Sequence, residues 1–446
     1  MVVLLKTLQV ILALSILVFF HELGHFFFAK LFGIRVDKFF LFFDVSGFKL
    51  FSTKGRLFTK LFPSAASWDT EYGIGWLPLG GYCKIAGMID ESLDTEQLGK
   101  EPQPWEFRSK KVWQRILVMS GGVLNNFLLA ILVFSWIMYR YGDAYISNED
   151  SRVWVNEFAY DMGFRNGDKI LTLDDYRPED FDMIQADIVR KRVARVGVLR
   201  GDDTLSVYVD ESLTSEMLDP ANRMFSLAVG LKVNRIPEGS PNAECGILPG
   251  DLILSVDGQP LDYVQQLQGL LAGKADTLLA ATYLRGSDTL ATGLYVDASS
   301  RANIEFAVDE LKTRSFSLAE SIPAGCAKAW DTVCGYLRDL RLVFTPSTGA
   351  YKSVGSVIAI GQVFPSVWNW GSFMYILAIL SIMLGVMNLL PIPALDGGHI
   401  VFGLYELFTG RKPGEKFLLV TQMIGMLLLI LLMFLAFGND IHRLLN

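Results

Sequence analysis

Two histidines and a glutamate with the spacing of a metal site stand near the start of the chain. His21, Glu22 and His25 occur in the order His-Glu-Leu-Gly-His. On a helix, residues four apart project from the same face, so both imidazoles can reach one Zn²⁺ ion. The glutamate then lies beside a water on the metal and can act as a general base. The spacing therefore predicts the chemistry of a zinc-dependent hydrolase.

The motif lies inside an almost unbroken apolar segment. The residues from Val10 to Phe20 precede it, and a run of three phenylalanines from Phe26 to Phe28 follows it. Ionisable groups at membrane depth are costly and are usually retained for function. The setting therefore predicts that the metal of this hydrolase lies within a bilayer.

The composition indicates a protein that is partly embedded in a membrane and partly exposed to water. Of the 446 residues, 51% are hydrophobic and 20% are charged, and the mean hydropathy is +0.34. The chain is too apolar for an ordinary soluble protein and too charged to lie wholly in lipid. The net charge of −7, without a basic cluster of the kind that follows a phosphate backbone, argues against a nucleic-acid partner.

Four apolar segments are long enough to cross a bilayer, whose hydrocarbon core of ~30 Å needs about 20 helical residues. They cover about residues 3–28, 112–137, 372–390 and 417–437. Lys and Arg are frequent in segments 31–111 and 401–416, which the positive-inside rule places in the cytoplasm. Both termini and the region between the second and third spans are then expected on the opposite side. The first segment lacks a small-residue cleavage site, so we expect a retained helix rather than a signal peptide.

The large segment between the second and third spans contains an internal repeat. The pattern Gly-x-x-x-Gly-Asp-x-Ile-Leu begins at Gly163 and again at Gly246, and Leu-Arg-Gly-x-Asp-Thr-Leu begins at Leu199 and again at Leu284. This spacing is the size of a small domain rather than of a solenoid unit. Each copy alternates short β-rich runs with Gly/Asp turns. The second copy resembles a bacterial PDZ domain strongly, and the first resembles it less well.

A third metal ligand is needed, because a catalytic zinc usually has three protein ligands and an open position. Asp396 is the best candidate, since it lies in Asn-Leu-Leu-Pro-Ile-Pro-Ala-Leu-Asp-Gly-Gly at the cytoplasmic end of the third span. The orientation of the spans places it in the same leaflet as His21 and His25. His399, three residues further along, is the rival ligand. A role of Asp396 as a helix N-cap alone also stays open.

Three features together resemble the site-2 protease family of intramembrane zinc metalloproteases, and its bacterial RseP-type branch in particular. They are the His-Glu-Leu-Gly-His motif, the Asp-Gly-Gly segment of the third span and the PDZ-like repeat between the second and third spans. The resemblance covers nearly the whole chain in order. It implies that His21, His25 and Asp396 bind Zn²⁺ and that Glu22 is the general base.

The same resemblance implies a substrate class and a location. Members of the family perform regulated intramembrane proteolysis of single-pass membrane proteins that a site-1 protease has already trimmed. Anti-sigma factors and remnant signal peptides are the expected types of substrate. The expected location is the bacterial inner membrane, with both termini and the PDZ-like region in the periplasm. The PDZ-like domains would then act as a size filter for substrates.

Several residues resemble family positions that hold the substrate. The segment of about residues 70–88 resembles a membrane re-entrant β-hairpin with Gly80-Gly81 at its turn, which could pair with substrate as an added strand. Asn388 and the turn at Pro391 resemble positions that clamp the substrate backbone. Asn126 aligns with a family asparagine in the second span. Simpler roles stay open, namely an ordinary turn for the glycines and helix-packing hydrogen bonds for the asparagines.

The chain departs from the family pattern at two places, and two other functions are weighed against the first. Val123 and Ser356 stand where the family usually has proline, which leaves the local backbone geometry open. One alternative is a membrane-anchored quality-control metallopeptidase with a cytosolic site, but no suitably placed glutamate follows His25 in its helix. The other is a non-catalytic PDZ scaffold, against which the intact Glu22 argues.

The expected fold is a polytopic α-helical membrane protein with four transmembrane helices, a cytoplasmic-side re-entrant β-hairpin and two extracytoplasmic PDZ-like α+β domains. Its expected parts are a first transmembrane helix (1–30), a cytoplasmic-side loop with the hairpin (31–111), a second transmembrane helix (112–140), two PDZ-like domains (141–225 and 226–300), an amphipathic helix with a membrane-return segment (301–371), a third transmembrane helix (372–400), a cytoplasmic loop (401–416) and a fourth transmembrane helix with a tail (417–446).

Overall fold

The computed structural model divides into two compact units. The first comprises Met1–Asp143, Ser315–Arg341 and Tyr351–Asn446, and the second comprises Ala144–Arg314 and Leu342–Ala350. The first unit contains all the candidate zinc ligands, and the second contains the internal repeat. The residues described are 2–88, 101–219, 222–237, 239–308, 311–345, 348, 350–353 and 355–445.

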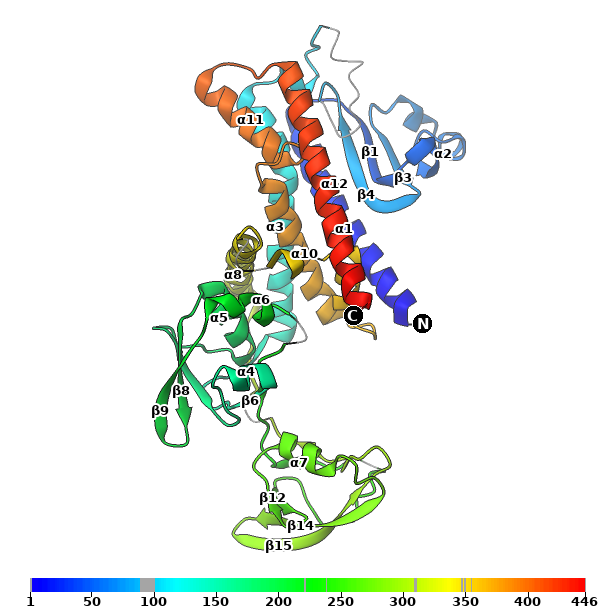
Figure 1. Cartoon of the computed structure of the whole chain (residues 1–446). Helices are drawn as coiled ribbons and strands as arrows, with labels where there is room; N and C mark the ends of the chain where they lie inside the picture. Colours follow the sequence, from blue (N-terminus) through cyan, green and yellow to red (C-terminus); the bar gives the residue numbers. More distant parts are fainter. Residues whose placement is uncertain are drawn as a thin grey trace. The chain divides into compact units, whose positions relative to one another are not determined.

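Four helices of the first unit are long and apolar enough to cross a membrane, which confirms the four predicted spans. Three of them, α1, α3 and α10, share an apolar core that includes Leu17, Phe134 and Ile382. Figure 1 shows the spans running alongside one another. They are α1 (Val2–Leu31), α3 (Val112–Tyr141), α10 (Trp370–Leu389) and the part Lys416–Asp440 of α12 (Glu415–Leu445).

Two glycines allow α1 and α3 to cross at very short range. A Cβ atom added to Gly24 would overlap the backbone carbonyl of Gly121, and one added to Gly121 would overlap that of Gly24. Small residues allow the backbones of membrane helices to approach closely. Because Gly24 lies inside the His-Glu-Leu-Gly-His motif, this crossing brings α3 directly against the two histidines.

The segment 372–400, expected as one transmembrane helix, is two helices. α10 ends at Leu389, and α11 (Asp396–Thr409) begins after a break. Pro391 and Pro393 explain the break, because proline lacks an N–H donor and disfavours helical geometry in the residue before it. Gly397 allows the first turn of α11 to lie against the end of α10, since a Cβ there would overlap the carbonyl of Leu390. Asp396 therefore opens a new helix instead of lying within the span.

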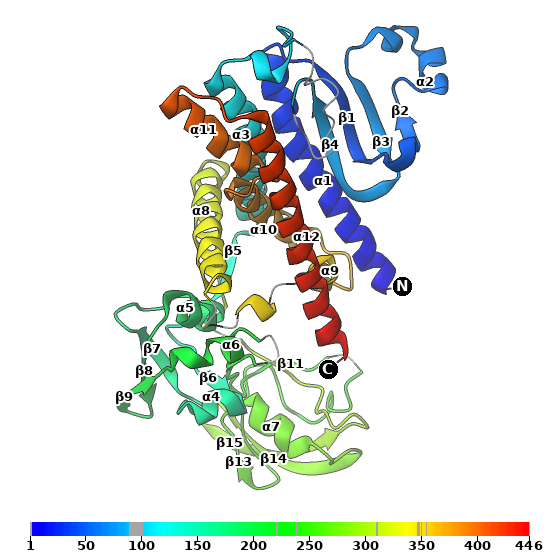
Figure 2. The same ribbon diagram turned by 45° about the horizontal axis from the view of Figure 1, so that its top comes forward.

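The chain between α1 and α3 forms a four-stranded sheet in the order β2-β3-β1-β4, which lies beside α1 in Figure 2. β1 pairs with β3 in parallel and with β4 in antiparallel fashion. The strands β2 and β4 are thus the two edges of the sheet. The strands are β1 (Val36–Phe43), β2 (Lys49–Ser52), β3 (Glu71–Gly75) and β4 (Leu77–Ile85).

The prediction of a hairpin turn at Gly80-Gly81 is wrong. Both glycines lie inside β4, with Gly81 opposite Leu41 of β1, and β3 and β4 are not neighbours in the sheet. Glycine is required here for packing rather than for turning. A Cβ on Gly80 would meet the ring of Phe43, and a Cβ on Gly81 would meet Val18 of α1. Gly81 therefore allows β4 to lie close against the first span, and Gly80 allows it to lie close against Phe43 of β1.

The second unit contains two lobes, each with its own apolar core and one copy of the repeat. The first lobe contains α4 (Glu157–Asp161), α5 (Ile184–Lys191), α6 (Thr214–Met217), β6 (Val153–Val155), β7 (Lys169–Leu173), β8 (Arg195–Arg200), β9 (Asp203–Tyr208) and β10 (Phe225–Leu227). The second contains α7 (Val264–Leu271), β11 (Val233–Arg235), β12 (Leu252–Val256), β13 (Gln259–Pro260), β14 (Thr277–Arg285), β15 (Asp288–Val296) and β16 (Glu305–Phe306).

The aspartate and the arginine of the repeat form the same contacts in both lobes. Arg200 donates two hydrogen bonds to the carboxylate of Asp168, both at 2.8 Å. Arg285 donates two to Asp251, at 2.9 and 2.7 Å. Each arginine also donates to the carbonyl of the first glycine of its repeat. The aspartate and the arginine of each copy thus form the same contacts.

The pair of Asp251 and Arg285 makes the second lobe sensitive to acid. Hydrogen bonds from the Arg285 guanidinium hold the pKa of the Asp251 carboxyl below its usual value. A lowered folded-state pKa stabilises the lobe above the unfolded pKa of about 4, and this stabilisation is lost as pH falls through the folded pKa. We expect Asp251→Asn to lower the free energy of unfolding by about 2 kcal/mol at neutral pH, and the difference from wild type to shrink at acid pH.

Calorimetry of the full chain across this pH range measures both effects. The exposed Asp262, replaced in the same way, provides the control. Equal unfolding temperatures for the two variants at neutral pH would contradict the prediction.

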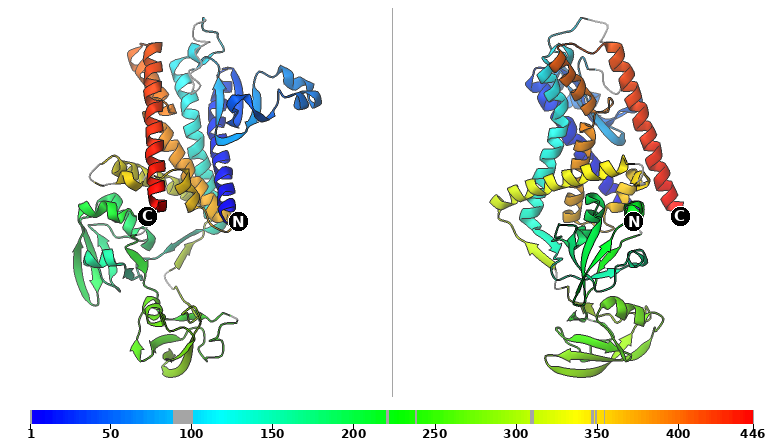
Figure 3. Two further views of the ribbon diagram at one scale, coloured as in Figure 1. Left: turned by 45° about the vertical axis from the view of Figure 1, so that its right-hand side comes forward. Right: turned by 60° about the vertical axis from the view of Figure 1, so that its left-hand side comes forward.

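Of the remaining elements, α8 follows the second lobe and packs against the spans. α8 is amphipathic, as the spacing of its apolar residues predicts, and its Val333, Tyr336 and Leu340 pack on the core of the spans. Gly325 of α8 lies so close to Ser135 of α3 that a Cβ would overlap it, and Figure 3 shows α8 running across the spans rather than along them. These elements are α2 (Arg56–Leu61), α8 (Leu318–Val343), α9 (Val357–Val363), β5 (Asp143–Ile146) and β17 (Leu311–Arg314).

Candidate metal centre

The three predicted ligands converge on one point. The Nε2 atoms of His21 and His25 on α1 each lie 3.3 Å from Oδ2 of Asp396 at the start of α11. The two Nε2 atoms are 3.3 Å from each other. Among the residues that the structure describes, this trio is the one group of His, Cys, Asp or Glu side chains with the geometry to hold a metal ion. A helix break and a distant span thus bring together residues that are 371 positions apart.

The backbone of α3 fixes the protonation of His25. Its Nδ1 lies 2.9 Å from the carbonyl oxygen of Val118, and both groups are buried. A carbonyl can only accept a hydrogen bond, so Nδ1 carries the proton and Nε2 keeps its lone pair. The free lone pair points at Asp396, as a metal ligand requires.

Asn126 performs the corresponding task for His21. Its side-chain amide lies 3.1 Å from Nδ1 of His21, and its Oδ1 has no hydrogen-bond partner among the described residues. Rotation of the Asn126 amide by half a turn exchanges the positions of its oxygen and nitrogen. Its Oδ1 then accepts a hydrogen bond from a protonated Nδ1 of His21, and Nε2 of His21 keeps a lone pair for a metal. The hydroxyl of Ser381 on α10 holds the backbone of Asn126 by donating to its carbonyl at 2.8 Å. Asn126, predicted to bind substrate, therefore lies where it orients His21.

The side chains of His21, His25 and Asp396 together fit a cation, and their close approach is electrostatically unfavourable without one. Oδ2 of Asp396 is buried, and no hydrogen bond to it is found in the described part of the chain. Two imidazole lone pairs and one carboxylate oxygen thus face one another at short range. Nitrogen and oxygen donors in this number are the ligands of a catalytic zinc, which keeps its fourth position open. The donor set therefore matches Zn²⁺.

Comparison with known proteins identifies the family. A sequence model described as "Peptidase family M50" matches residues 9–432. The chain belongs to peptidase family M50. A protein of Neisseria meningitidis named "Putative zinc metalloprotease" is 27% identical, over 98% of this chain and 99% of its own length. "Regulator of sigma E protease" of Salmonella typhi and "Protease RseP" of Yersinia pestis are each 27% identical, over 97% of this chain and 98% of their own lengths.

These matches confirm the resemblance to the site-2 proteases. Family membership and the names of the relatives, together with the donor set, make this M50 peptidase a zinc metalloendopeptidase. Its four apolar helices make it a membrane protein.

Glu22 lies on α1 between the two histidines and faces the sheet. Its side chain is half-buried and hydrogen-bonds the backbone of Cys83 in β4. The edge strand of the sheet therefore runs past the candidate general base of the M50 site. The sequence predicted a substrate-pairing strand in this segment, but it assigned the glycines of β4 to a turn.

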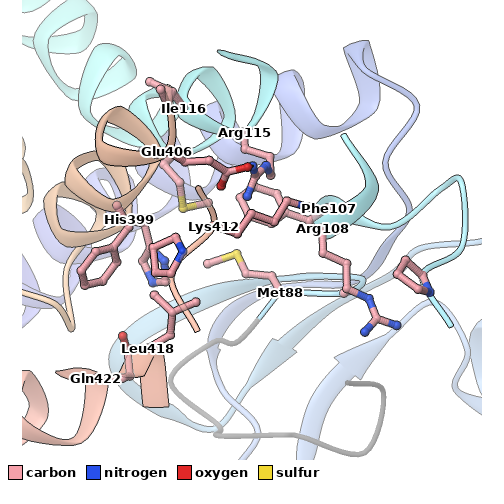
Figure 4. Close-up of a pocket in the computed structure, with 16 residues that line it drawn as sticks. Met88, Phe107, Arg108, Arg115, Ile116, His399, Glu406, Lys412, Leu418 and Gln422 are labelled. Atoms are coloured by element: carbon pink, nitrogen blue, oxygen red, sulfur yellow. The ribbon is translucent and has the colours of Figure 1, made fainter. Parts of the chain in front are cut away.

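Three other predicted site residues, Asn388, Pro391 and His399, lie outside the ligand trio. Asn388 is close, with Nδ2 3.4 Å from Nε2 of His21. Pro391 lies in the break before α11, where it is exposed. His399 is outside the ligand trio and lines a cavity of about 260 Å³ together with the ion pair of Arg115 and Glu406, as Figure 4 shows. The structure thus favours Asp396 over His399 as the third ligand.

Gly122 is a further residue of the M50 site, and its role was not predicted from the sequence. A Cβ atom added to it would lie 2.5 Å from Cε1 of His21 and 2.6 Å from Nε2 of His25. Both distances are far below van der Waals contact. The absence of a side chain at this position therefore gives the imidazoles their room.

We expect Gly122→Ala to push the imidazoles out of position and weaken zinc binding by about 10–100-fold. Cleavage should fall with it. The measurement is zinc content and affinity of purified protein, with thermal stability recorded in parallel. Gly438→Ala is the matched control, because Gly438 also lies in a span but has open space around its Cβ position. Equal zinc affinity for the two variants would refute this role.

Proposed function

We propose that the chain is an intramembrane zinc endopeptidase in which His21, His25 and Asp396 hold Zn²⁺ and Glu22 is the general base. The observation that supports this most directly is the convergence of the three ligand atoms between helices long and apolar enough to span a bilayer. A quality-control metallopeptidase with a glutamate ligand is less well supported, because the described structure places an aspartate from another helix in that position.

Each protein group has a defined task in peptide hydrolysis. When bound, Zn²⁺ supplies Lewis acidity, which polarises the scissile carbonyl and makes water acidic enough to be deprotonated near neutral pH. Glu22 takes the proton from the attacking water and later delivers it to the leaving amine. Val118 and Asn126 keep the imidazoles in the required orientation. Asn388, beside His21, and the break at Pro391 hold the substrate backbone.

The edge strand β4 presents the substrate. A transmembrane helix hides its carbonyls in internal hydrogen bonds, and once it is unwound its backbone groups need partners in a medium with little water. β4 has an edge on the side away from β1, and it passes Glu22 at Cys83. An unwound substrate segment adds to this edge as a further strand. Gly81 contributes by keeping β4 close to α1, and Gly80 by keeping it close to Phe43 of β1.

The substrates are single-pass membrane proteins that have lost their external domain to a site-1 protease. Anti-sigma factors and remnant signal peptides are the classes we infer, because two relatives carry names that refer to the sigma E system or to RseP. The protein lies in the bacterial inner membrane, with its termini and the second unit in the periplasm. The two lobes of the second unit are PDZ-like domains that act as a size filter.

A pair of reporter substrates tests this function. Reconstituted protein should cleave a single-pass reporter without an external domain and spare the same reporter with a folded external domain. Deletion of residues 150–300 should remove this discrimination and leave zinc binding intact, because all three ligands lie in the first unit. Unchanged discrimination in the deletion variant would refute the filter, and no cleavage of either reporter by the wild type would refute the protease.

A further inference from the structure

A strongly basic and apolar segment projects from the sheet. We call residues 45–68 the basic wing; it contains β2, α2 and the short 3₁₀ helix Pro63–Ser67. No acidic residue occurs within it, although it contains four cations. Lys49 pairs with Glu71 of β3 at 2.6 Å. Lys54, Arg56 and Lys60 are exposed, and none has an acidic partner among the described residues.

The wing also exposes large apolar side chains. Isolated exposed apolar residues are normal on soluble proteins, but a group within one short segment marks an interaction surface. Here the group accompanies cations that are free to bind anions. The exposed fractions are 62% for Phe48, 64% for Leu50, 67% for Leu61, 54% for Phe62 and 42% for Trp68.

A chain of aromatic contacts connects the wing to the first span. Phe58 of α2 contacts Trp68 with ring centroids 6.4 Å apart, and Trp68 contacts Tyr72 of β3 at 6.1 Å. Tyr72 in turn contacts Phe26 of α1 at 5.9 Å. Figure 2 shows α2 at the end of the sheet that lies away from the spans. The wing is therefore attached at one height of α1 and extends sideways from it.

The wing is attached near the end of α1 that the proposed orientation of the spans places at the cytoplasmic face. Phe26 directly follows His25 and precedes the end of α1 at Leu31 by five residues, which is about 7.5 Å along a helix. Interfacial segments bury their apolar face about 5–10 Å deep at this boundary. Anionic lipids attract clusters of Lys and Arg on the cytoplasmic leaflet. Depth, charge and exposed apolar side chains therefore agree.

We propose that the basic wing docks on the inner leaflet, inserting its exposed apolar side chains between lipids while Lys54, Arg56 and Lys60 bind the phosphates of anionic phospholipids. The proposal goes beyond the proteolytic function and rests on the proposed orientation of the spans. Docking fixes the height of the sheet whose edge strand passes Glu22. The lipid composition of the leaflet then influences how β4 meets the substrate.

Photo-crosslinking of the full chain in nanodiscs tests the docking. A photoreactive benzoylphenylalanine replaces Leu61, whose side chain is exposed at the end of α2. The nanodiscs contain phosphatidylcholine with about 30% phosphatidylglycerol, an anionic lipid. The same group at position 428, exposed on a span, is the lipid control, and at position 208, exposed on β9, it is the water control.

We expect lipid adducts at positions 61 and 428 and none at 208. At position 61, the ratio of phosphatidylglycerol to phosphatidylcholine among the adducts should be about fivefold higher than in the nanodisc, because one cation near the surface favours an anionic lipid by this factor. At position 428 the adducts should follow the bulk composition. The variant Lys54→Gln/Arg56→Gln/Lys60→Gln should lose the enrichment at position 61. The matched control Arg177→Gln/Arg195→Gln/Arg301→Gln, which neutralises exposed cations of the second unit, should keep it.

Three results would overturn the proposal. They are protein adducts at position 61, which would identify a protein partner or a second copy of the chain, no adduct there, or lipid adducts with the bulk composition. The cross-linking needs no catalysis, so a failure of the docking is distinguished from a failure of the proteolytic function by cleavage of the trimmed reporter in the same nanodiscs.

Discussion

Glu22→Gln is expected to keep zinc bound and to lose cleavage by about 10²–10⁴-fold, the range that a general acid–base contributes. Glutamine has the size of glutamate and can keep the contact with the backbone of Cys83. It cannot accept the proton of the attacking water. Because the proposed ligand atoms belong to His21, His25 and Asp396, the site should still bind its metal. Catalysis and metal binding are thus separated by one substitution.

The measurement combines zinc stoichiometry with cleavage of the trimmed reporter under single-turnover conditions. Glu157→Gln, at the start of α4 in the second unit, is the matched control and should behave as the wild type. Substantial cleavage by Glu22→Gln would assign the base to another group. Loss of zinc in the same variant would indicate that Glu22 also supports the ligands.

The metal ligands and the spans could be predicted from the sequence because both depend on local patterns. Helical periodicity places His21 and His25 on one face, and uninterrupted apolar length identifies a span. The prediction of Asp396 required a further step. The positive-inside rule had to place the histidines of the first span and the end of the third span in the same leaflet. The structure brings the three residues together without contradiction.

The geometry around the ligands could not be predicted, because it depends on how backbones pack. The carbonyl of Val118 orients His25, but every residue has a carbonyl and nothing in the sequence singles this one out. Gly122 is one of two adjacent glycines in an apolar helix, which indicates close packing but not the neighbour. The predicted role of Asn126 as a substrate contact was based on a family position, whereas its amide faces His21.

The two corrections to the fold have different causes. Gly80-Gly81 is a strong turn signal when it is considered alone, yet here the absence of side chains allows β4 to pack against Phe43 of β1 and Val18 of α1. A tertiary contact thus outweighs a local preference. In the third span, the apolar segment was expected to end near residue 390 with a turn at Pro391, and the error lay in extending the transmembrane helix to residue 400 past two helix-breaking prolines. Both places lie next to the ligands, where the chain must be irregular to bring an edge strand and a carboxylate to the metal.

Asp396→Asn is expected to weaken zinc binding by more than about 100-fold and to abolish cleavage. Removing even an outer-shell partner of a metal ligand costs about 10–100-fold in affinity, so the loss of a ligand charge should cost more. Asp396 is the first residue of α11 and Leu395 is its N-cap, so asparagine at position 396 removes no capping hydrogen bond. The substitution therefore leaves the start of α11 intact and tests the metal role alone.

His399→Ala is the matched control for this prediction, because His399 lies three residues further along α11 but outside the ligand trio. It should keep zinc stoichiometry and cleavage close to those of the wild type. Isothermal titration of the metal-free protein with zinc, together with reporter cleavage, distinguishes the two variants. If His399→Ala lost zinc while Asp396→Asn kept it, the third ligand would be the imidazole, and α11 would have to rotate to bring it to His21 and His25. A carboxylate at the first position of a helix that follows a proline break is instead already aimed at both histidines, so the rotation is unnecessary.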